Sequence, residues 1–141
     1  MTAETYRSEI STDLATALVS AARTGLGDTL RSVVYFTPSS FDVVYLRQEL
    51  YDSPDAARPA KEPLVELERV GFAEVPVRTA TAEREGGSNI GPYEFTVRFH
   101  EDGFVIRVLQ EDAGVVLTAD SMDINAFEDA ATAVRRLLAN A

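Results

Sequence analysis

Arg98 and Arg107 have the strongest case for binding chemistry, because they are like charges in neighbouring predicted strands. They lie in residues 93–99 and 104–110, two strand-like segments that are separated by a short turn. In either hairpin register that the spacing allows, the two arginines stand opposite or diagonal to one another, on the sheet face away from the phenylalanines. Like charges so placed repel one another unless a negative group lies between them.

The source of that negative charge is left open by the sequence. A carboxylate of this chain, from Glu94, Glu66 or Glu68, would make the arrangement a structural ion pair. Alternatively, the two arginines bind an anion or an acidic segment of a partner protein. We therefore treat Arg98 and Arg107 as candidate anion-binding or partner-binding residues.

The sequence offers no set of residues suited to nucleophilic catalysis. His100 is the only histidine, and it is followed by Glu101, Asp102 and Gly103 in a predicted turn. A turn tip is solvated, whereas a general base needs a fixed and partly buried position. There is no cysteine, which excludes disulfides, thiolate chemistry and cysteine-ligated metals. We therefore predict that the protein is not an enzyme and has no catalytic residue.

Metal, cofactor and nucleotide sites are not expected either. The glycine-rich segment 86–91 lacks the Gly-Lys-Ser or Gly-Lys-Thr ending of a phosphate-binding loop and predicts a flexible connector. The adjacent carboxylates lack calcium-loop spacing and are typical of a solvated acidic surface. They are Glu101 with Asp102, Glu111 with Asp112, and Asp120 with Asp123. We predict no cofactor and no bound metal.

The composition describes the expected solvent more than the expected partner. Acidic residues outnumber basic ones by 23 to 13, and the basic residues are twelve arginines and one lysine, Lys61. An acidic surface with little lysine keeps its hydration in molar salt, as in proteins of extremely halophilic archaea. An arginine-rich, high-GC genome is the alternative explanation. The charge near the tyrosines is not basic, so we interpret them as packing residues and do not expect nucleic-acid binding. They include Tyr35, Tyr45, Tyr51 and Tyr93.

Periodic segments predict three helices and five strands. Apolar residues at steps of three and four predict helices over about residues 4–24, over 63–70 and from 123 to the end. Alternating or continuous apolar residues predict a hairpin over residues 32–47 and a three-stranded meander over 93–119. Both faces of the hairpin are apolar, so we expect helices to cover both.

The meander carries the predicted core. Phe95, Val97, Phe99 and Ile106 fall on one face by alternation and are expected to be buried. A two-residue turn would place Phe99 opposite Ile106, and a four-residue loop would place it opposite Phe104.

The length predicts one α+β domain over residues 1–141. Residues 52–63 and 82–92 are rich in proline or glycine and predict flexible loops. Residues 72–80 are either irregular or an edge strand, because Pro76 cannot donate to a central ladder. No leader peptide or apolar span is apparent, so a cytoplasmic protein is expected.

The predicted order of helix, hairpin, short helix, meander and helix resembles the roadblock modules of dynein light chains and small GTPase regulators, within the profilin-like group. The long segment 52–92 departs from that pattern. The segments that carry the resemblance precede the final helix and read SVVYFT, FDVVYLR, YEFTVRF, FVIRVLQ and GVVLTAD. The resemblance implies a five-stranded antiparallel sheet between helices and a non-enzymatic platform that dimerises and holds a partner protein, such as a GTPase or motor subunit.

The function expected from these observations is an interaction or regulatory domain, homodimeric, that acts through sheet-edge or helix-face contacts with protein partners. Neither a membrane nor a nucleic acid is expected as a partner. The alternative is a small-ligand-sensing domain of the PAS or GAF type, which would need an enclosed apolar pocket inside the sheet.

Overall fold

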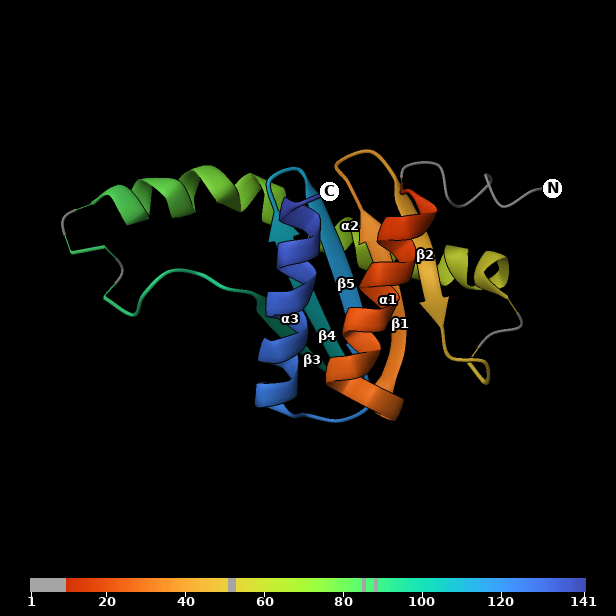
Figure 1. Ribbon diagram of the computed structural model, residues 1–141. Coiled ribbons are helices and arrows are strands. Elements are labelled where there is room, and N and C mark those ends of the chain that lie inside the picture. Colours follow the sequence, from red (N-terminus) through yellow and green to blue (C-terminus); the bar gives the residue numbers. More distant parts are fainter. Residues whose placement is uncertain (1–9, 51–52, 85, 88) are drawn as a thin grey trace.

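The computed structural model describes residues 10–50, 53–84, 86–87 and 89–141. Five antiparallel strands form one sheet in the order β2-β1-β5-β4-β3, so β2 and β3 are its edges. Helices α1 and α3 cover one face, and α2 crosses the other (Figure 1). The elements are α1 (Thr12–Leu26), a 3-10 turn η2 (Gly27–Thr29), β1 (Leu30–Phe36), β2 (Phe41–Leu46), α2 (Pro54–Glu83), β3 (Thr96–His100), β4 (Gly103–Gln110), β5 (Ala113–Ala119) and α3 (Ile124–Ala139).

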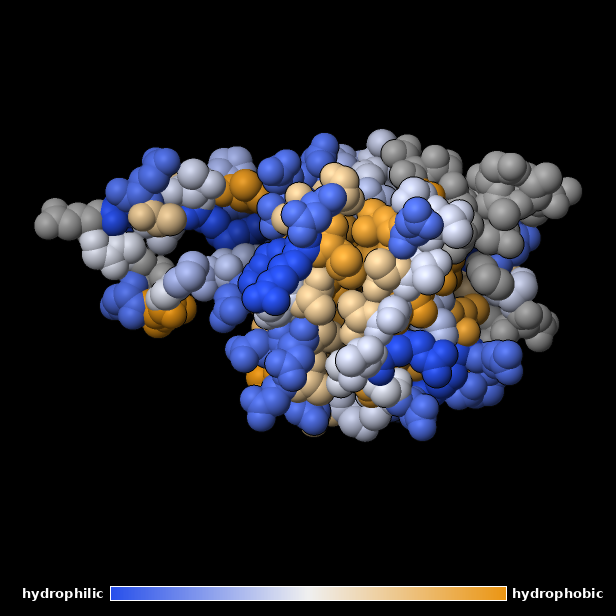
Figure 2. Space-filling model, viewed as in Figure 1, coloured by the Kyte–Doolittle hydropathy of each residue, from blue (hydrophilic) through white to orange (hydrophobic). Residues whose placement is uncertain are grey.

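The face under α1 and α3 carries the larger core. Asp123 begins α3 as predicted, because its side chain accepts a hydrogen bond from the Ala126 amide. The two helices approach closely at Gly25, where a Cβ would lie 3.0 Å from the Cβ of Ala130. Figure 2 shows apolar residues gathered along the line where the helices meet. The predicted stripe of α3 lies in this core, with Phe127 and Val134 fully buried.

The meander adopts the register of the four-residue loop. Phe99 pairs with Phe104 and Val97 with Ile106. Ile106 is fully buried, and Val97 is half-buried. The prediction that Phe99 lies in the core is wrong, because its side chain is 69% exposed. Phe99 lies near the end of the edge strand β3, and its ring packs edge-on against Phe104, with 5.2 Å between the ring centroids.

Helix α2 is where the structure departs most from expectation. Of the predicted loop over 52–63, residue 52 lies outside the described residues, and the prediction is wrong over 54–63, which are helical. Residues 72–80 are helical rather than irregular or extended. Residues 82 and 83 also belong to α2, which leaves the described residues after Arg84 as the connection to β3. The helix begins at a side-chain cap, since Ser53 accepts a hydrogen bond from the Ala56 amide. Pro54 follows at the first helical position, where an N–H would have no partner within the helix.

Tertiary contacts explain how α2 tolerates three internal prolines, Pro59, Pro63 and Pro76. Ala57 and Val65 are fully buried on the sheet. Three basic side chains of α2 also form hydrogen bonds with the hairpin. Arg58 donates to the Phe41 carbonyl at 2.8 Å and Arg69 to the Thr37 carbonyl at 2.9 Å. Lys61 donates to Ser32 Oγ at 3.0 Å. This packing confirms that a middle helix covers the second apolar face.

Candidate functional site

The two candidate arginines share one buried carboxylate. Glu68 of α2 is fully buried between them; its Oε2 lies 2.7 Å from Arg98 Nε and its Oε1 lies 3.5 Å from Arg107 Nη1. The arginines are diagonal on the sheet, because Arg107 pairs with Thr96. Glu68 therefore supplies the negative charge that the sequence required. Binding of an anion or a partner by Arg98 and Arg107 stays a prediction.

Arg107 makes further contacts that the sequence did not indicate. Its side chain is 2% exposed, and its Nη2 donates to Glu74 Oε1 at 2.9 Å, to Thr96 Oγ1 at 2.9 Å and to the Tyr93 hydroxyl at 3.2 Å. Burial disfavours the charge, but the hydrogen bond to Tyr93 and the charge of Glu74 outweigh it and hold the pKa of Arg107 above its usual value. Arg107 is therefore charged in the folded protein and contacts Glu68, Glu74, Tyr93 and Thr96.

Glu74 is the residue of this network that sequence reasoning missed. Burial opposes its charge, yet hydrogen bonds from Arg78 and Arg107 hold the pKa of its carboxyl below the usual range. The spacing of Glu74 and Arg78, four residues apart on one helix, was the signal that could have identified it. Tyr93, interpreted from the sequence as a packing residue, has its ring centre 4.2 Å from the Arg78 guanidinium, while its hydroxyl contacts the buried Arg107.

A second polar cluster lies under the first half of α2. Lys61 Nζ donates to Ser32 Oγ at 3.0 Å, and Ser32 Oγ lies 2.5 Å from Thr118 Oγ1. Burial, with a smaller effect of the Arg31 charge, lowers the pKa of Lys61 to about 8. A serine beside a lysine of lowered pKa is one arrangement for nucleophilic catalysis. Here Ser32 is fully buried beneath the helix, so a substrate cannot reach its hydroxyl.

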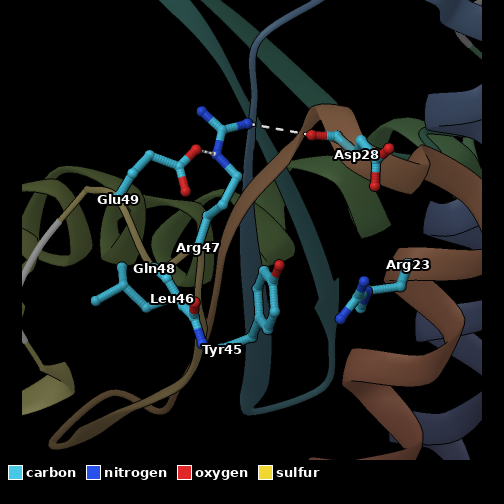
Figure 3. Close-up of a pocket in the computed structure, with 7 residues that line it drawn as sticks. All are labelled: Arg23, Asp28, Tyr45, Leu46, Arg47, Gln48 and Glu49. Atoms are coloured by element: carbon cyan, nitrogen blue, oxygen red, sulfur yellow. Dashed lines mark hydrogen bonds and ion pairs between the residues drawn. The ribbon is translucent and has the colours of Figure 1, made fainter.

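A polar pocket of about 500 Å³ lies between α1 and the end of β2 (Figure 3). The Arg23 guanidinium lies 5.4 Å from the ring centre of Tyr45. Arg47 is paired with Glu49 and with Asp120 Oδ2, and it donates to the Asp28 carbonyl at 3.1 Å. Within the lining, Arg47 and Glu49 form an ion pair, and none of the lining residues is a serine, threonine, cysteine, lysine or histidine. It is lined by Arg23, Asp28, Tyr45, Leu46, Arg47, Gln48 and Glu49.

The last part of α2 and the segment that returns to β3 form an arm, which we define as the described residues from Pro76 to Phe95. Figure 1 shows the arm projecting beyond the β3 edge of the sheet, and Figure 2 shows a hollow between its two limbs. The hollow is an open groove of about 960 Å³ with a mostly apolar lining. Val77 and Ile90, which line it, are 68% and 90% exposed.

Most of the exposed apolar side chains of the described residues belong to three elements: α2, the returning segment and β3. Nine large hydrophobic residues in the described part of the chain are exposed, and seven of them belong to α2, the returning segment or β3. Of the other two, Met122 lies just before α3 and Ile124 is its first residue. The seven are Leu67, Val70, Val75, Val77, Ile90, Tyr93 and Phe99.

The remaining candidates for chemistry do not converge. His100 is exposed at the end of β3. In the part of the chain that the structure describes, no three His, Cys, Asp or Glu side chains come together in a way that could hold a metal ion. Among the same residues, no helix is both long enough and apolar enough to cross a membrane.

Comparison with known proteins places the fold and the family. The structure is similar to that of the gliding protein MglB from Thermus thermophilus, with a TM-score of 0.57 and 15% sequence identity over 94% of this chain and 96% of that chain. This likeness shows the predicted α+β, roadblock-like fold. No curated protein matches the chain. A family model described as a domain of unknown function, DUF7522, matches residues 16–139, and the chain therefore belongs to that family.

Proposed function

We propose that this domain is a non-enzymatic interaction or regulatory module that works as a homodimer, with the edge of β3 and the outward side of α2 as its contact surface. The observation that carries the proposal is the concentration of exposed apolar side chains on α2, the arm and β3. Contiguous exposed apolar surface on a small domain marks an interaction site. The roadblock-like fold supports a role in binding proteins rather than in chemistry.

The outward side of α2 has the pattern of a second helix-packing face. Leu67, Val70 and Val77 are exposed at helical spacing, with the small Ala73 between them. The opposite side of the same helix buries Val65 against the sheet. A helix with apolar stripes on two sides is typical of an element packed between two partners.

The β3 edge offers main-chain groups for pairing. β3 pairs with β4 on one side, and the sheet has no strand beyond it among the described residues. Unpaired edge groups form hydrogen bonds with an added strand. Antiparallel pairing with β3 of a second copy about a twofold axis would join the two sheets and close the assembly as a dimer.

The length of the arm fits this arrangement. α2 passes β4 at Gly71, where a Cβ would lie 2.7 Å from the Arg107 guanidinium. The twelve residues from there to Glu83 extend about 18 Å at 1.5 Å per residue. The spacing from β4 to β3 is only about 5 Å. The helix therefore runs well past β3, and a sheet joined at β3 would lie over it (Figure 1).

Ligand sensing is the second candidate, and the arm groove is the observation that favours it. Its apolar lining suits a small molecule. However, the groove is open and lies outside the sheet, whereas a PAS-like or GAF-like sensor would enclose its ligand within the fold. The predicted halophilic and cytoplasmic setting, and a further protein partner of the dimer, stay predictions.

Sedimentation velocity over a range of protein concentrations, in low and in multimolar KCl, tests the homodimer. We expect a concentration-dependent dimer in the wild type. Val77→Glu should weaken association by about tenfold or more, since it introduces a charge at the apolar contact. Ile124→Glu is the matched control, because Ile124 is similarly exposed, at 54%, but lies at the start of α3. A monomeric wild type under every condition would overturn the proposal.

A further inference from the structure

The root of the arm is tied to the sheet by one carboxylate oxygen. Glu74 Oε1 accepts hydrogen bonds from Arg78 Nη1 at 2.6 Å and from Arg107 Nη2 at 2.9 Å. Arg78 lies at the start of the arm, and Arg107 is a buried residue of β4. A single shared acceptor therefore connects the projecting helix to the rigid part of the fold.

The same network holds the returning limb of the arm. The Tyr93 ring lies under the Arg78 guanidinium at 4.2 Å, and its hydroxyl contacts Arg107 Nη2 at 3.2 Å and Thr96 Oγ1 at 2.6 Å. Thr96 is the first residue of β3 and itself accepts from Arg107. The helix, the returning segment and the β3 edge thus meet at one guanidinium.

The helix lacks one of its own hydrogen bonds at this point. Pro76 has no N–H, so the carbonyl of Phe72 lacks its usual partner within the helix. Arg78 Nη2 donates instead to the carbonyl of Gly71 at 3.3 Å, bridging the turn that contains the proline. Helices kink at prolines, so contacts such as this one can influence the direction of the helix beyond Pro76.

We propose that this network, which we name the arm latch and which consists of Glu74, Arg78, Tyr93, Thr96 and Arg107, fixes the arm relative to β3 and so preorganises the surface for a second copy of this chain. The inference rests on the proposed homodimer. The two parts of the contact surface, the β3 edge and the arm, come from segments that no continuous helix or strand joins. Holding them in one arrangement before association removes an ordering cost that would otherwise weaken the dimer.

A partly buried ion network suits this role better than a role in stability. The free energy needed to remove two charges from water offsets much of the free energy gained from their attraction, so an ion pair adds little stability. Each bond of the pair is directional, however, and therefore favours one arrangement of the side chains. In the arm latch the Arg107 side chain is 2% exposed, whereas the side chain of its partner Glu74 is 44% exposed. The solvent-facing carboxylate is therefore the member that can be altered with least effect on folding.

Glu74→Gln is the probing variant, because the amide keeps the shape but removes the charge that both arginines share. Glu49→Gln is the matched control, since Glu49 also pairs with an arginine, Arg47, at the far edge of the sheet. Amide hydrogen exchange by mass spectrometry reads the order of the arm, at residues 77–83 and 89–96. Sedimentation velocity measures the extent of dimerisation, and thermal unfolding measures the stability of the fold.

We expect Glu74→Gln to unfold cooperatively like the wild type, to lose protection in both limbs of the arm by about tenfold, and to dimerise about tenfold more weakly. Tyr93→Phe keeps the ring but removes the hydroxyl, and should loosen the returning limb in the same assay. Glu49→Gln should change neither arm protection nor association.

Wild-type protection and wild-type association in Glu74→Gln would overturn the latch. A loosened arm with unchanged association would overturn its link to dimerisation while leaving the homodimer intact. A monomeric wild type would remove the homodimer, and the exchange measurement would then decide alone whether the latch orders the arm.

Discussion

Replacing Lys61 by methionine should stabilise this protein at neutral pH. Lys61 is 8% exposed beneath α2, and its ammonium group donates to a hydroxyl, Ser32 Oγ; it forms no ion pair with a carboxylate of the described residues. Burial lowers the pKa of Lys61 from 10.5 to about 8. At about 1.4 kcal/mol for each pH unit, keeping the buried lysine charged below pH 8 costs about 3 kcal/mol relative to a neutral lysine.

The sign of the pH dependence follows from that lowered pKa. Between about pH 8 and pH 10.5 the unfolded chain holds a proton on Lys61 and the folded chain does not, so the free energy of unfolding rises with pH in this window. Below pH 8 both states are protonated, and the full cost is present. Above pH 10.5 neither is, and the cost is gone.

Lys61→Met abolishes this contribution. The lost hydrogen bond to Ser32 is worth about 1 kcal/mol, and Ser32 keeps its bond to Thr118, so we expect a net stabilisation of about 2 kcal/mol at pH 7. Urea unfolding of both proteins from pH 7 to pH 10.5 measures it, and the difference between the two removes the titration of other groups. The advantage of the methionine should shrink as pH rises. A variant that is less stable at pH 7, by an amount that does not change with pH, would refute the reasoning.

Two further predictions concern packing and acid stability. Gly71→Ala should lower the free energy of unfolding by about 1–3 kcal/mol, because its Cβ would lie 2.6 Å from Leu109 Cδ1 and 2.7 Å from the Arg107 guanidinium; urea unfolding measures it. Hydrogen bonds from Arg47 and Arg31 hold the pKa of Asp120 below its usual value, so Asp120 contributes stability above that value, which is lost as pH falls through the lowered pKa. Asp120→Asn should therefore unfold with a weaker dependence on acidic pH than the wild type, measured by circular dichroism, and an equal dependence would contradict the pairing.

The sheet could be predicted from the sequence because its information is local. Alternation along residues 93–119 identified three strands, and the charge argument led to Glu68 as one possible partner of Arg98 and Arg107. The same alternation also placed Phe99 on the core side of the sheet. It could not show that the helices leave this end of the edge strand β3 uncovered.

Only residues 63–70 of helix α2 were predicted to be helical, because local sequence rules take account of its prolines and glycines but not of its contacts with residues distant in the chain. Pro59 and Pro63 argue for a loop when only neighbours are considered. Bonds to Phe41, Ser32 and Thr37, which are remote in the chain, hold the helix in place. Glu74 and Tyr93 were missed as a pair for the same reason, since only the folded chain brings them to Arg107.

The strand order also constrains how the chain can be assembled during synthesis. β5 is the last strand to be made, yet it lies at the centre of the sheet and joins β1 to β4. Until it emerges, the β1–β2 hairpin and the β3–β4 hairpin share no ladder. Contacts so distant along the chain slow folding. A ribosome-bound chain that ends before residue 113 would therefore carry two separate hairpins with exposed apolar faces, and the last thirty or so residues commit the whole domain to its native form.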